Sequence, residues 1–262
     1  MVKRSQPCKS RIAEASTMDP LLISAASGMK ARMESLDLLA NNLANAGTAG
    51  FKSDREFYGL YSHSLSNEDA FNEALPLLEK QWTDYSQGAL IPTGNPLDFG
   101  LSGKGFFAVN SPAGTVYTRN GEFGISAKNQ LQTIQGYTLR NARDGGNPIT
   151  IDPAKALEVL KDGVVRQGGK QIAQIEIAAV DSTSQVLSKL GNSYFALLPP
   201  GGAIPSADTE IQQGTLEQSN VPVADGAVRL VSVMRQFEML QKALTLGADM
   251  NKQAIEDVAK VS

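Results

Sequence analysis

Both ends of this chain carry long apolar stripes at helical spacing, and these stripes constrain the fold more than any other feature. Near the N-terminus, apolar residues alternate between spacings of four and three, the a/d repeat of a helix that packs lengthwise on another helix. Asp19 can cap this helix, Pro20 suits its first turn, and Gly47 follows its end. The sequence predicts a helix over residues 19–46, with a stripe formed by Leu22, Ala26, Met29, Met33, Leu36, Ala40 and Leu43.

A second stripe predicts a longer helix over residues 224–260, formed by Leu230, Val233, Phe237, Leu240 and Leu244. This stripe weakens at Gly247 and Asn251, and Gly226 points to a start beyond residue 224 because glycine disfavours helix. A long amphipathic helix needs a partner for its apolar stripe. We therefore expect the terminal helices to pack against each other or against other subunits. Two helices packed on one globular core is the alternative.

Between the helices, roughly over residues 85–217, the period changes to that of short β-strands separated by glycine-rich turns. Asn120-Gly121 favours a tight hairpin, because both positions tolerate a positive φ. Many short strands without intervening helices argue for an antiparallel barrel or sandwich. The predicted fold class is α+β, an antiparallel β-rich centre between long terminal helices. The expected strands are 97–101, 106–109, 116–119, 123–125, 137–139, 149–151, 172–179 and 194–198.

The chain divides into five segments on this basis. Residues 1–17 form a basic leader, in which Lys3, Arg4, Lys9 and Arg11 oppose only Glu14. The leader lacks the apolar region of a secretory signal peptide. We interpret it as an upstream extension or a mis-assigned start, with a disordered basic arm as the alternative. The other segments are the N-terminal helix and turn (18–60), a linker (61–84), the β-rich domain (85–217) and the C-terminal helix (218–262).

Little in the sequence points to catalysis, and we expect no catalytic residue, cofactor, metal site or small-molecule substrate. His63 is the only histidine and Cys8 the only cysteine, so clusters of His or Cys ligands cannot form. The glycines at 100–105 fit neither a dinucleotide nor a phosphate loop. A glycosidase pair among carboxylates such as Asp98 and Glu122 stays open, because such pairs meet only in space. The net charge of −3 argues against nucleic acid as a partner.

Three asparagines, Asn41, Asn42 and Asn45, stand near the end of the first predicted helix, where they lower helix propensity. One interpretation is a polar face followed by a C-terminal cap. The other is that the amides form hydrogen bonds between helices and fix their register, as polar groups do in helical seams. The sequence leaves both interpretations open.

Segments in three parts of the chain resemble the signatures of one family, in the order in which that family carries them. They are 27–45 with 48–52, then 103–109 with 117–123, then 213–221 with 235–238. In all three the chain is similar to the flagellar basal-body rod proteins and their hook relatives. The residues that carry the resemblance are Asn41, Asn42, Asn45, Gly50, Phe51, Lys52, Gly105, Phe106, Phe107, Arg119, Gly121, Gly214, Leu216, Ser219, Asn220, Val221 and Arg235.

The resemblance implies a structural subunit of the bacterial flagellar rod with no catalytic role. The terminal helices would form a coiled-coil-like inner layer of a self-assembling tube, with the β domain outside. The subunit would pass through the flagellar type III export apparatus without a cleaved signal peptide and join a periplasmic driveshaft. Its partners would be copies of itself, other rod proteins, the export apparatus and the rings around the rod.

Within this family, residues 86–90 and 93–98 are most similar to the proximal rod proteins, and the distal rod proteins are the close alternative. Two other functions remain as alternatives at this stage. One is a secreted hydrolase on a β scaffold, and the other is an unrelated surface fibre protein.

Overall fold

The computed structural model describes residues 20–62, 74–179, 186–198, 204–205 and 209–261. The chain folds into two compact units and passes between them after Leu39, Arg55, Gln81 and Ala227. We call them the helical unit and the β unit; the β unit comprises Ala40–Arg55 and Trp82–Ala227. Each of the four crossings lies inside a regular element, namely α1 (Pro20–Ala44), β1 (Asp54–Ser62), β2 (Ala74–Thr83) and α2 (Val223–Val261).

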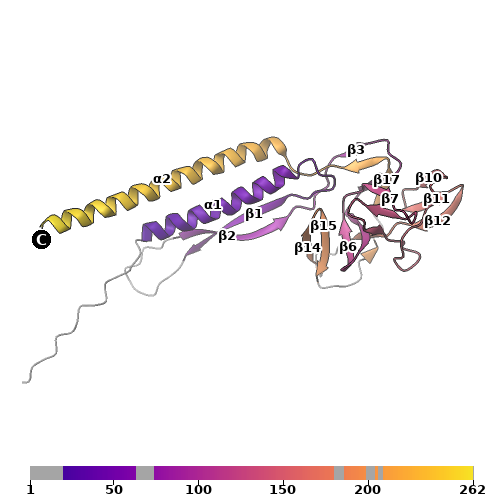
Figure 1. Cartoon of the computed structure of the whole chain (residues 1–262), viewed down its shortest axis with the longest axis horizontal. Helices are drawn as coiled ribbons and strands as arrows, with labels where there is room; N and C mark the ends of the chain where they lie inside the picture. The colour runs from indigo at the N-terminus through magenta and orange to yellow at the C-terminus, as the bar shows by residue number, and fades with distance from the viewer. Residues whose placement is uncertain (1–19, 63–73, 180–185, 199–203, 206–208, 262) are drawn as a thin grey trace, which may run out of the picture. The chain divides into compact units, whose positions relative to one another are not determined.

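The helical unit contains most of both terminal helices, and these confirm the predicted helices to within two residues at each end. α1 and α2 are in contact, because a Cβ added at Gly28 would lie 3.7 Å from Leu240 Cδ1. Figure 1 shows α1 running beside α2 and the β1–β2 ribbon. Within the described residues, neither helix combines the length and the apolarity of a membrane span.

The expectation that the C-terminal helix starts beyond residue 224 is wrong. α2 begins at Val223, and the Gly226 amide donates to Pro222 O at 2.8 Å. Gly226 therefore lies in the first turn of the helix, where ends fray and a glycine costs less than in the interior.

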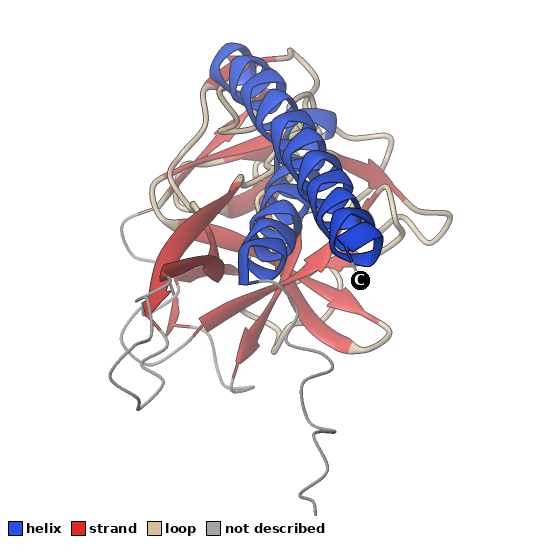
Figure 2. Ribbon diagram, turned by 90° about the vertical axis from the view of Figure 1, so that its left-hand side faces the viewer, coloured by secondary structure: helices blue, strands red, loops and turns tan. Residues whose placement is uncertain are grey.

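The β unit is built on antiparallel strand pairs, which confirms the predicted fold class (Figure 2). Its main sheet has the order β14 (Val186–Gly191), β15 (Tyr194–Leu198), β6 (Gly114–Thr118), β5 (Gly105–Ser111), β9 (Thr138–Leu139), β8 (Leu131–Thr133) and β7 (Phe123–Ile125). Beside this path, β13 (Ile177–Ala179) pairs with β5 and with β16 (Ile204–Pro205). A three-stranded sheet follows the order β10 (Leu157–Val159), β11 (Val164–Gln167), β12 (Lys170–Gln174). Two short ribbons complete the unit, β17 (Glu210–Gln213) with β4 (Phe99–Ser102) and β18 (Thr215–Glu217) with β3 (Leu90–Pro92).

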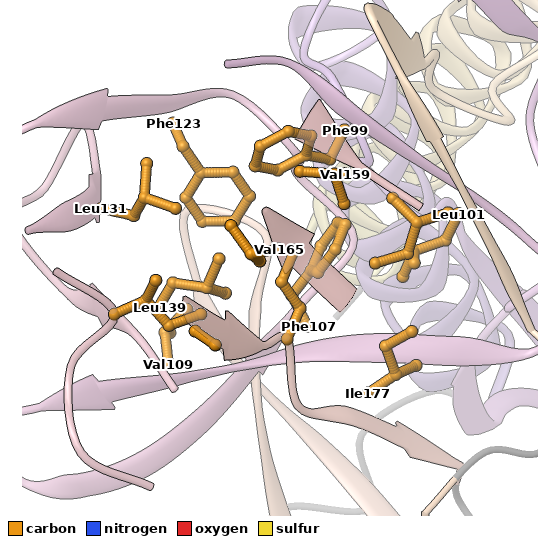
Figure 3. Close-up of a cluster of buried hydrophobic side chains, with 14 of the residues drawn as sticks. Phe99, Leu101, Phe107, Val109, Phe123, Leu131, Leu139, Val159, Val165 and Ile177 are labelled. Atoms are coloured by element: carbon orange, nitrogen blue, oxygen red, sulfur yellow. The ribbon is translucent and has the colours of Figure 1, made fainter. Parts of the chain in front are cut away.

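Strand β5 separates two apolar cores, which explains why it is apolar at every position from 106 to 109. Phe107 and Val109 enter the main core (Figure 3), and Phe106 and Ala108 enter a smaller one on the other face. Successive residues of a strand point to opposite faces, so a strand covered on both sides reads as a continuous apolar run. The main core also contains Phe99, Leu101, Phe123, Leu131, Leu139, Ile149, Val165, Ile175 and Ile211.

The predicted hairpin at Asn120-Gly121 is wrong. β6 pairs with β5 and β15, β7 pairs with β8, and neither Asn120 nor Gly121 has a positive φ. Gly121 instead lies against β4: its carbonyl accepts the Phe99 amide at 2.9 Å, and an added Cβ would lie 1.7 Å from Phe99 O. The glycine is required because two backbones approach closely here. In a sequence, a glycine with this role cannot be distinguished from a glycine in a turn.

The segment 61–84, expected from the sequence to be a linker, contains strand β2, and β2 pairs with β1. The β unit begins at residue 82 rather than 85 and takes in residues 40–55 from the N-terminal segment. Leader residues 1–17, with Cys8, and residue His63 lie outside the described residues.

Candidate functional site: a buried ionic junction and two helix stripes

Three charged side chains from distant parts of the chain meet inside the β unit. Lys52 follows α1, Arg119 follows β6, and Glu217 ends β18. Glu217 Oε1 accepts Lys52 Nζ at 2.5 Å, and its Oε2 accepts Arg119 Nη1 at 2.9 Å. All three side chains are at most 2% exposed. We call Lys52, Arg119 and Glu217 the ionic junction.

The junction places two positive charges and one negative charge in the protein interior, so the cations need further acceptors. Lys52 Nζ also donates to Ser86 O at 2.7 Å, and the Arg119 guanidinium donates to Gly103 O and stands 5.1 Å from the centre of the Phe106 ring. Burial lowers the pKa of Lys52, and the charge and hydrogen bond of Glu217 oppose that shift. Burial likewise lowers the pKa of Arg119 against the same carboxylate. Because removing these charges from water is costly, the junction depends on well-aligned hydrogen bonds for every charged group and not on attraction between the charges alone.

Lys189, on β14, also contacts residues 51–54, the segment that contains Lys52. Its Nζ donates to Lys52 O at 2.9 Å and pairs with Asp54 Oδ2 at 2.8 Å. The same ammonium lies 4.1 Å from the centre of the Phe51 ring, within the range of a cation–π contact.

Asn42 and Asn220 complete the fastening with hydrogen bonds to backbone. Asn42 Nδ2 donates to Asp54 O at 2.7 Å while its Oδ1 accepts the Asp54 amide at 3.0 Å. Asn220 Oδ1 accepts the Ser53 amide at 2.7 Å, and its Nδ2 donates to Asp84 O at 2.7 Å. Asn45 Nδ2 donates to Asn41 O. Asn42, in the last turn of α1, and Asn45, just after α1, thus bond to nearby backbone rather than between helices.

Gly50 allows the N-terminal segment to approach Arg119 closely. It has a φ of +66°, and an added Cβ would lie 2.3 Å from the backbone of Arg119. A side chain here would be both strained and obstructed. Gly50 and Gly121 therefore bring residues 50–53, 119–121 and 217 together.

The residues that carry the family resemblance separate into those that meet at the junction and those that do not. Gly50, Lys52 and Arg119 bond directly to Glu217, and the contacts of Phe51, Asn42 and Asn220 hold the neighbouring residues 51–54. Gly105, Phe106 and Phe107 build β5, Gly214 has a φ of +74° between β17 and β18, and Leu216, Ser219 and Val221 are half-buried near α2. Asn41 and Arg235 are exposed. Nothing in the sequence had singled out Glu217 or Lys189, since their partners lie more than 90 residues away along the chain.

The predicted stripe of α2 faces inward. Val233 is buried, while Leu230, Phe237, Leu240 and Leu244 are half-buried, and Leu240 lies opposite Gly28 of α1. On α1 the predicted stripe alternates: Met29, Leu36 and Leu43 are half-buried, and Ala26, Met33 and Ala40 are exposed. The side chain of Leu22 lies outside the described side chains. The buried positions of α1 are Ala31, Ser35, Leu38, Leu39 and Asn42.

A second apolar stripe runs along the opposite face of α2. It consists of Val228, Val231, Met239, Leu246 and Met250, which are 49–73% exposed. At about 100° per residue these five side chains fall on one side of the helix, opposite Val233, Phe237 and Leu240. We call them the outer stripe. An exposed apolar stripe of this length marks an interaction surface.

Neither feature has the arrangement of a catalytic centre. Asp98, one member of the carboxylate pair left open above, is buried and accepts Thr93 Oγ1 at 2.6 Å and Asn95 Nδ2 at 2.8 Å, so it organises the turn before β4. Glu122 is exposed. Among the residues whose positions the structure gives, no three His, Cys, Asp or Glu side chains gather as metal ligands.

Comparisons with known proteins match most of the chain. A family model for flagella basal body rod proteins matches residues 22–52, one for the D1 domain of the flagellar hook protein FlgE/F/G matches 100–167, and one for the C-terminal part of flagellar basal body rod FlgEFG proteins matches 212–257.

Full-length relatives agree with these matches. The flagellar basal-body rod protein FlgF of Caulobacter vibrioides is 31% identical over 87% of this chain and 93% of its own length. FlgF of Mesorhizobium japonicum is 31% identical over 94% of this chain and 100% of its own length. FlgG of Bacillus subtilis is 28% identical over 86% and 93%. The chain therefore belongs to the flagellar basal-body rod protein family.

Proposed function

We propose that the chain, a structural subunit of the flagellar rod and not an enzyme, is joined to its neighbours through the outer stripe of α2. The observation that carries this proposal is that α2 has apolar side chains on two opposite faces, those of the outer face being interleaved with the exposed Arg235 and Lys242. The inner face meets α1 at Gly28 within the subunit, and the outer stripe has no covering among the described residues. Burying one such side chain stabilises an assembly by about 1.5–3 kcal/mol, so five together make a substantial interface.

The exposed positions of α1 supply a complementary surface. Ala26, Met33 and Ala40 repeat every seven residues and include two small side chains, which allow another helix to come close. A contact between α1 of one subunit and α2 of the next joins two different surfaces. Such heterologous contacts extend into a helical tube rather than closing into a dimer.

Within each subunit, the ionic junction lies where α1 and α2 are connected to the β unit. Residues 50–53 follow α1, residues 217–220 precede α2, and the two segments are bonded to each other. The segment after α1 and the segment before α2 are therefore held together within the β unit.

We place the subunit in the proximal rod, with copies of itself and other rod proteins as partners, and with passage through the flagellar export apparatus into the periplasm. Support for the proximal position comes from the FlgF proteins of Caulobacter vibrioides and Mesorhizobium japonicum, each 31% identical to this chain over at least 87% of it. Similarity to FlgG proteins at 28–31% identity keeps the distal rod as the neighbouring alternative.

The outer stripe can be tested in a strain from which the gene has been deleted. We expect the wild-type chain to restore swimming and the Leu246→Glu variant to fail, because a buried carboxylate without a partner opposes the contact. Basal bodies from the Leu246→Glu strain should end before the rod is complete. The matched control is Gln241→Glu, an exposed position of α2 away from the outer stripe. A complete rod in the Leu246→Glu strain would show that the stripe is not an assembly surface.

A further inference from the structure

Residues 209–220 complete two strand pairs of the β unit. β17 pairs with β4 over four residues, and β18 pairs with β3 over three. Within the described part of the chain, β17 and β18 are the sole strand partners of β4 and β3. Without residues 209–220, the buried strand β4 would present unpaired backbone groups next to the core, and the more exposed β3 would lose its strand partner.

The same segment also fills the core and joins the separate sheets. Ile211 is 1% exposed and lies in the main apolar core. Gln213 Nε2 donates to Pro96 O at 2.8 Å and to Leu157 O at 2.9 Å, and its Oε1 accepts the Val159 amide at 2.9 Å. One side chain therefore links the turn before β4 to the first strand of the three-stranded sheet.

Charge makes the insertion of this segment obligatory. Lys52 and Arg119 are both fully enclosed, and Glu217 is the carboxylate that pairs with both. Glu217 Oε1 also accepts the Gly88 amide at 2.9 Å. With Glu217 absent, the two cations would be enclosed without a counter-charge, which costs far more than leaving them in water. Residues 50–53 and 119 therefore cannot be stably packed in the β unit before Glu217 pairs with Lys52 and Arg119.

The N-terminal segment is held by the same residues. Gly50 N donates to Glu217 O at 2.7 Å, and Asn220 N donates to Phe51 O at 3.3 Å. The Ser53 amide donates to Asn220 Oδ1 at 2.7 Å. Each of these bonds joins residues more than 160 positions apart.

We infer that residues 209–220 are a closing segment, whose insertion fastens residues 50–53 and completes the β unit in one step. The device is conformational: β3, β4, Lys52 and Arg119 together accept an extended segment that carries a carboxylate at the position of Glu217. The consequence for delivery rests on the proposed function. A subunit that emerges N-terminus first cannot fasten α1 to its β unit until residue 220 has followed, so it stays open during passage.

The charge requirement is tested by equilibrium urea unfolding of the purified full-length chain, followed through Trp82 in the β unit. Glu217→Gln keeps the size of the side chain, removes its charge and replaces one of its two acceptor oxygens with an amide donor, and we expect the folded-to-unfolded ratio to fall at least about a hundredfold. The Lys52→Met, Glu217→Gln double variant removes one of the two unpaired cations and should recover part of that loss. The matched control is Glu210→Gln on β17, whose pair with Lys161 is exposed. A Glu217→Gln midpoint equal to that of Glu210→Gln would overturn the inference.

The order of closure is tested on the wild-type chain by pulsed hydrogen exchange during refolding. The amides of Gly50, Ser53, Gln218 and Asn220 are all bonded across the closing segment. We expect these four amides to gain protection with one rate constant. Protection of Gly50 and Ser53 before Gln218 would overturn the inference. Both measurements use purified protein, so their failure is distinguishable from failure of the proposed assembly surface, which is read out as rods in cells.

Discussion

At the scale of single residues, the protein uses glycine where two backbones must touch and charge where three segments must meet. Gly121 and Gly50 bring the chain against Phe99 and Arg119, and Glu217 then joins Lys52 to Arg119. The two ion pairs of Glu217 join residues 165 and 98 positions apart, so they form only in the folded chain.

Gly121→Ala tests the close approach to β4. The added Cβ would lie 1.7 Å from Phe99 O, so a backbone must shift, and we expect a loss of about 1–3 kcal/mol in the free energy of unfolding of the β unit. Urea unfolding followed through Trp82 measures it. Gly124→Ala is the control, because nothing lies within 4 Å of its added Cβ. Equal midpoints for the two variants would contradict the role assigned to Gly121.

The pH dependence of stability tests the enclosure of Lys52. Burial lowers the folded-state pKa of Lys52 below its usual 10.5, so the unfolded chain binds more protons between the two values. Stability contributed by this group therefore rises as the pH increases through that window, is fully present above 10.5, and is lost as the pH falls through the folded-state pKa.

Comparison with Lys52→Met isolates this contribution. Tyr85, Tyr117 and Tyr194 have pKa values raised by burial, so their ionisation lowers stability in the same alkaline range and affects both proteins equally. We expect the unfolding free energy of the wild type minus that of Lys52→Met to increase from neutral pH toward pH 10.5. A difference that stays flat or decreases would show that Lys52 is not enclosed as a cation.

At the scale of elements, the sheet edges offer little for contacts between subunits, which agrees with the proposal that assembly uses the helices. The edge strands of the sheets are poor templates for another strand. β7 has only three residues, β12 starts at Lys170 and β11 beside it carries a register shift, and β14 is irregular between Lys189 and Gly191. Short, charged or irregular edges resist pairing between molecules. The exposed apolar stripe of α2 has no such protection.

Gly28 tests the packing of α1 on α2. An added Cβ would meet Leu240 Cδ1 at 3.7 Å, an ordinary contact, and alanine favours helix over glycine. We therefore expect Gly28→Ala to stabilise α1 by about 0.5–1 kcal/mol. Slower amide exchange along α1 would show it, with Gly47→Ala, outside the helix and without neighbours within 4 Å, as the control. Faster exchange in Gly28→Ala would mean that the helices pack more closely than the structure shows.

Elements with a clear period were predictable, and contacts between distant elements were not. The repeat from Leu22 to Leu43 and the stripe from Leu230 to Leu244 located both helices, because one helix face recurs every three or four residues. The same period did not show that α2 has an exposed stripe as well, since exposure depends on where α1 lies. Strands of two to four residues, such as β3, β8 and β17, carry too few alternations to be recognised.

The ionic junction is the clearest case of contacts between distant residues that the sequence does not predict. Lys52 and Arg119 were noticed only through the family resemblance, and Glu217 stood among residues 215–220 with nothing to mark it. No local pattern signals an ion pair whose members are 98 and 165 positions apart. What identifies the three residues is their burial, which only the folded chain reveals.

At the scale of the whole molecule, the helical unit and the β unit have separate sources of stability. The β unit has two apolar cores and the junction, whereas the helical unit buries a few helix residues such as Ala31, Leu38 and Val233 and leaves the outer stripe exposed in the single chain. A helix whose apolar face is not covered opens more readily than a strand inside a core.

We therefore expect the isolated chain to lose its structure in two steps. Amides of α2 around Leu246 should exchange faster than those of β5 and β6, and the helical signal in circular dichroism should be lost at lower urea than Trp82 fluorescence changes. Gly121→Ala should move only the second step. A single transition seen by both probes would mean that the units unfold together.

The four crossings between the units have a mechanical consequence. Because α1, β1, β2 and α2 each run through a boundary as hydrogen-bonded elements, any twisting load passed from one unit to the other is shared among four covalent paths. No single loop carries it, and a break in one strand leaves three paths intact.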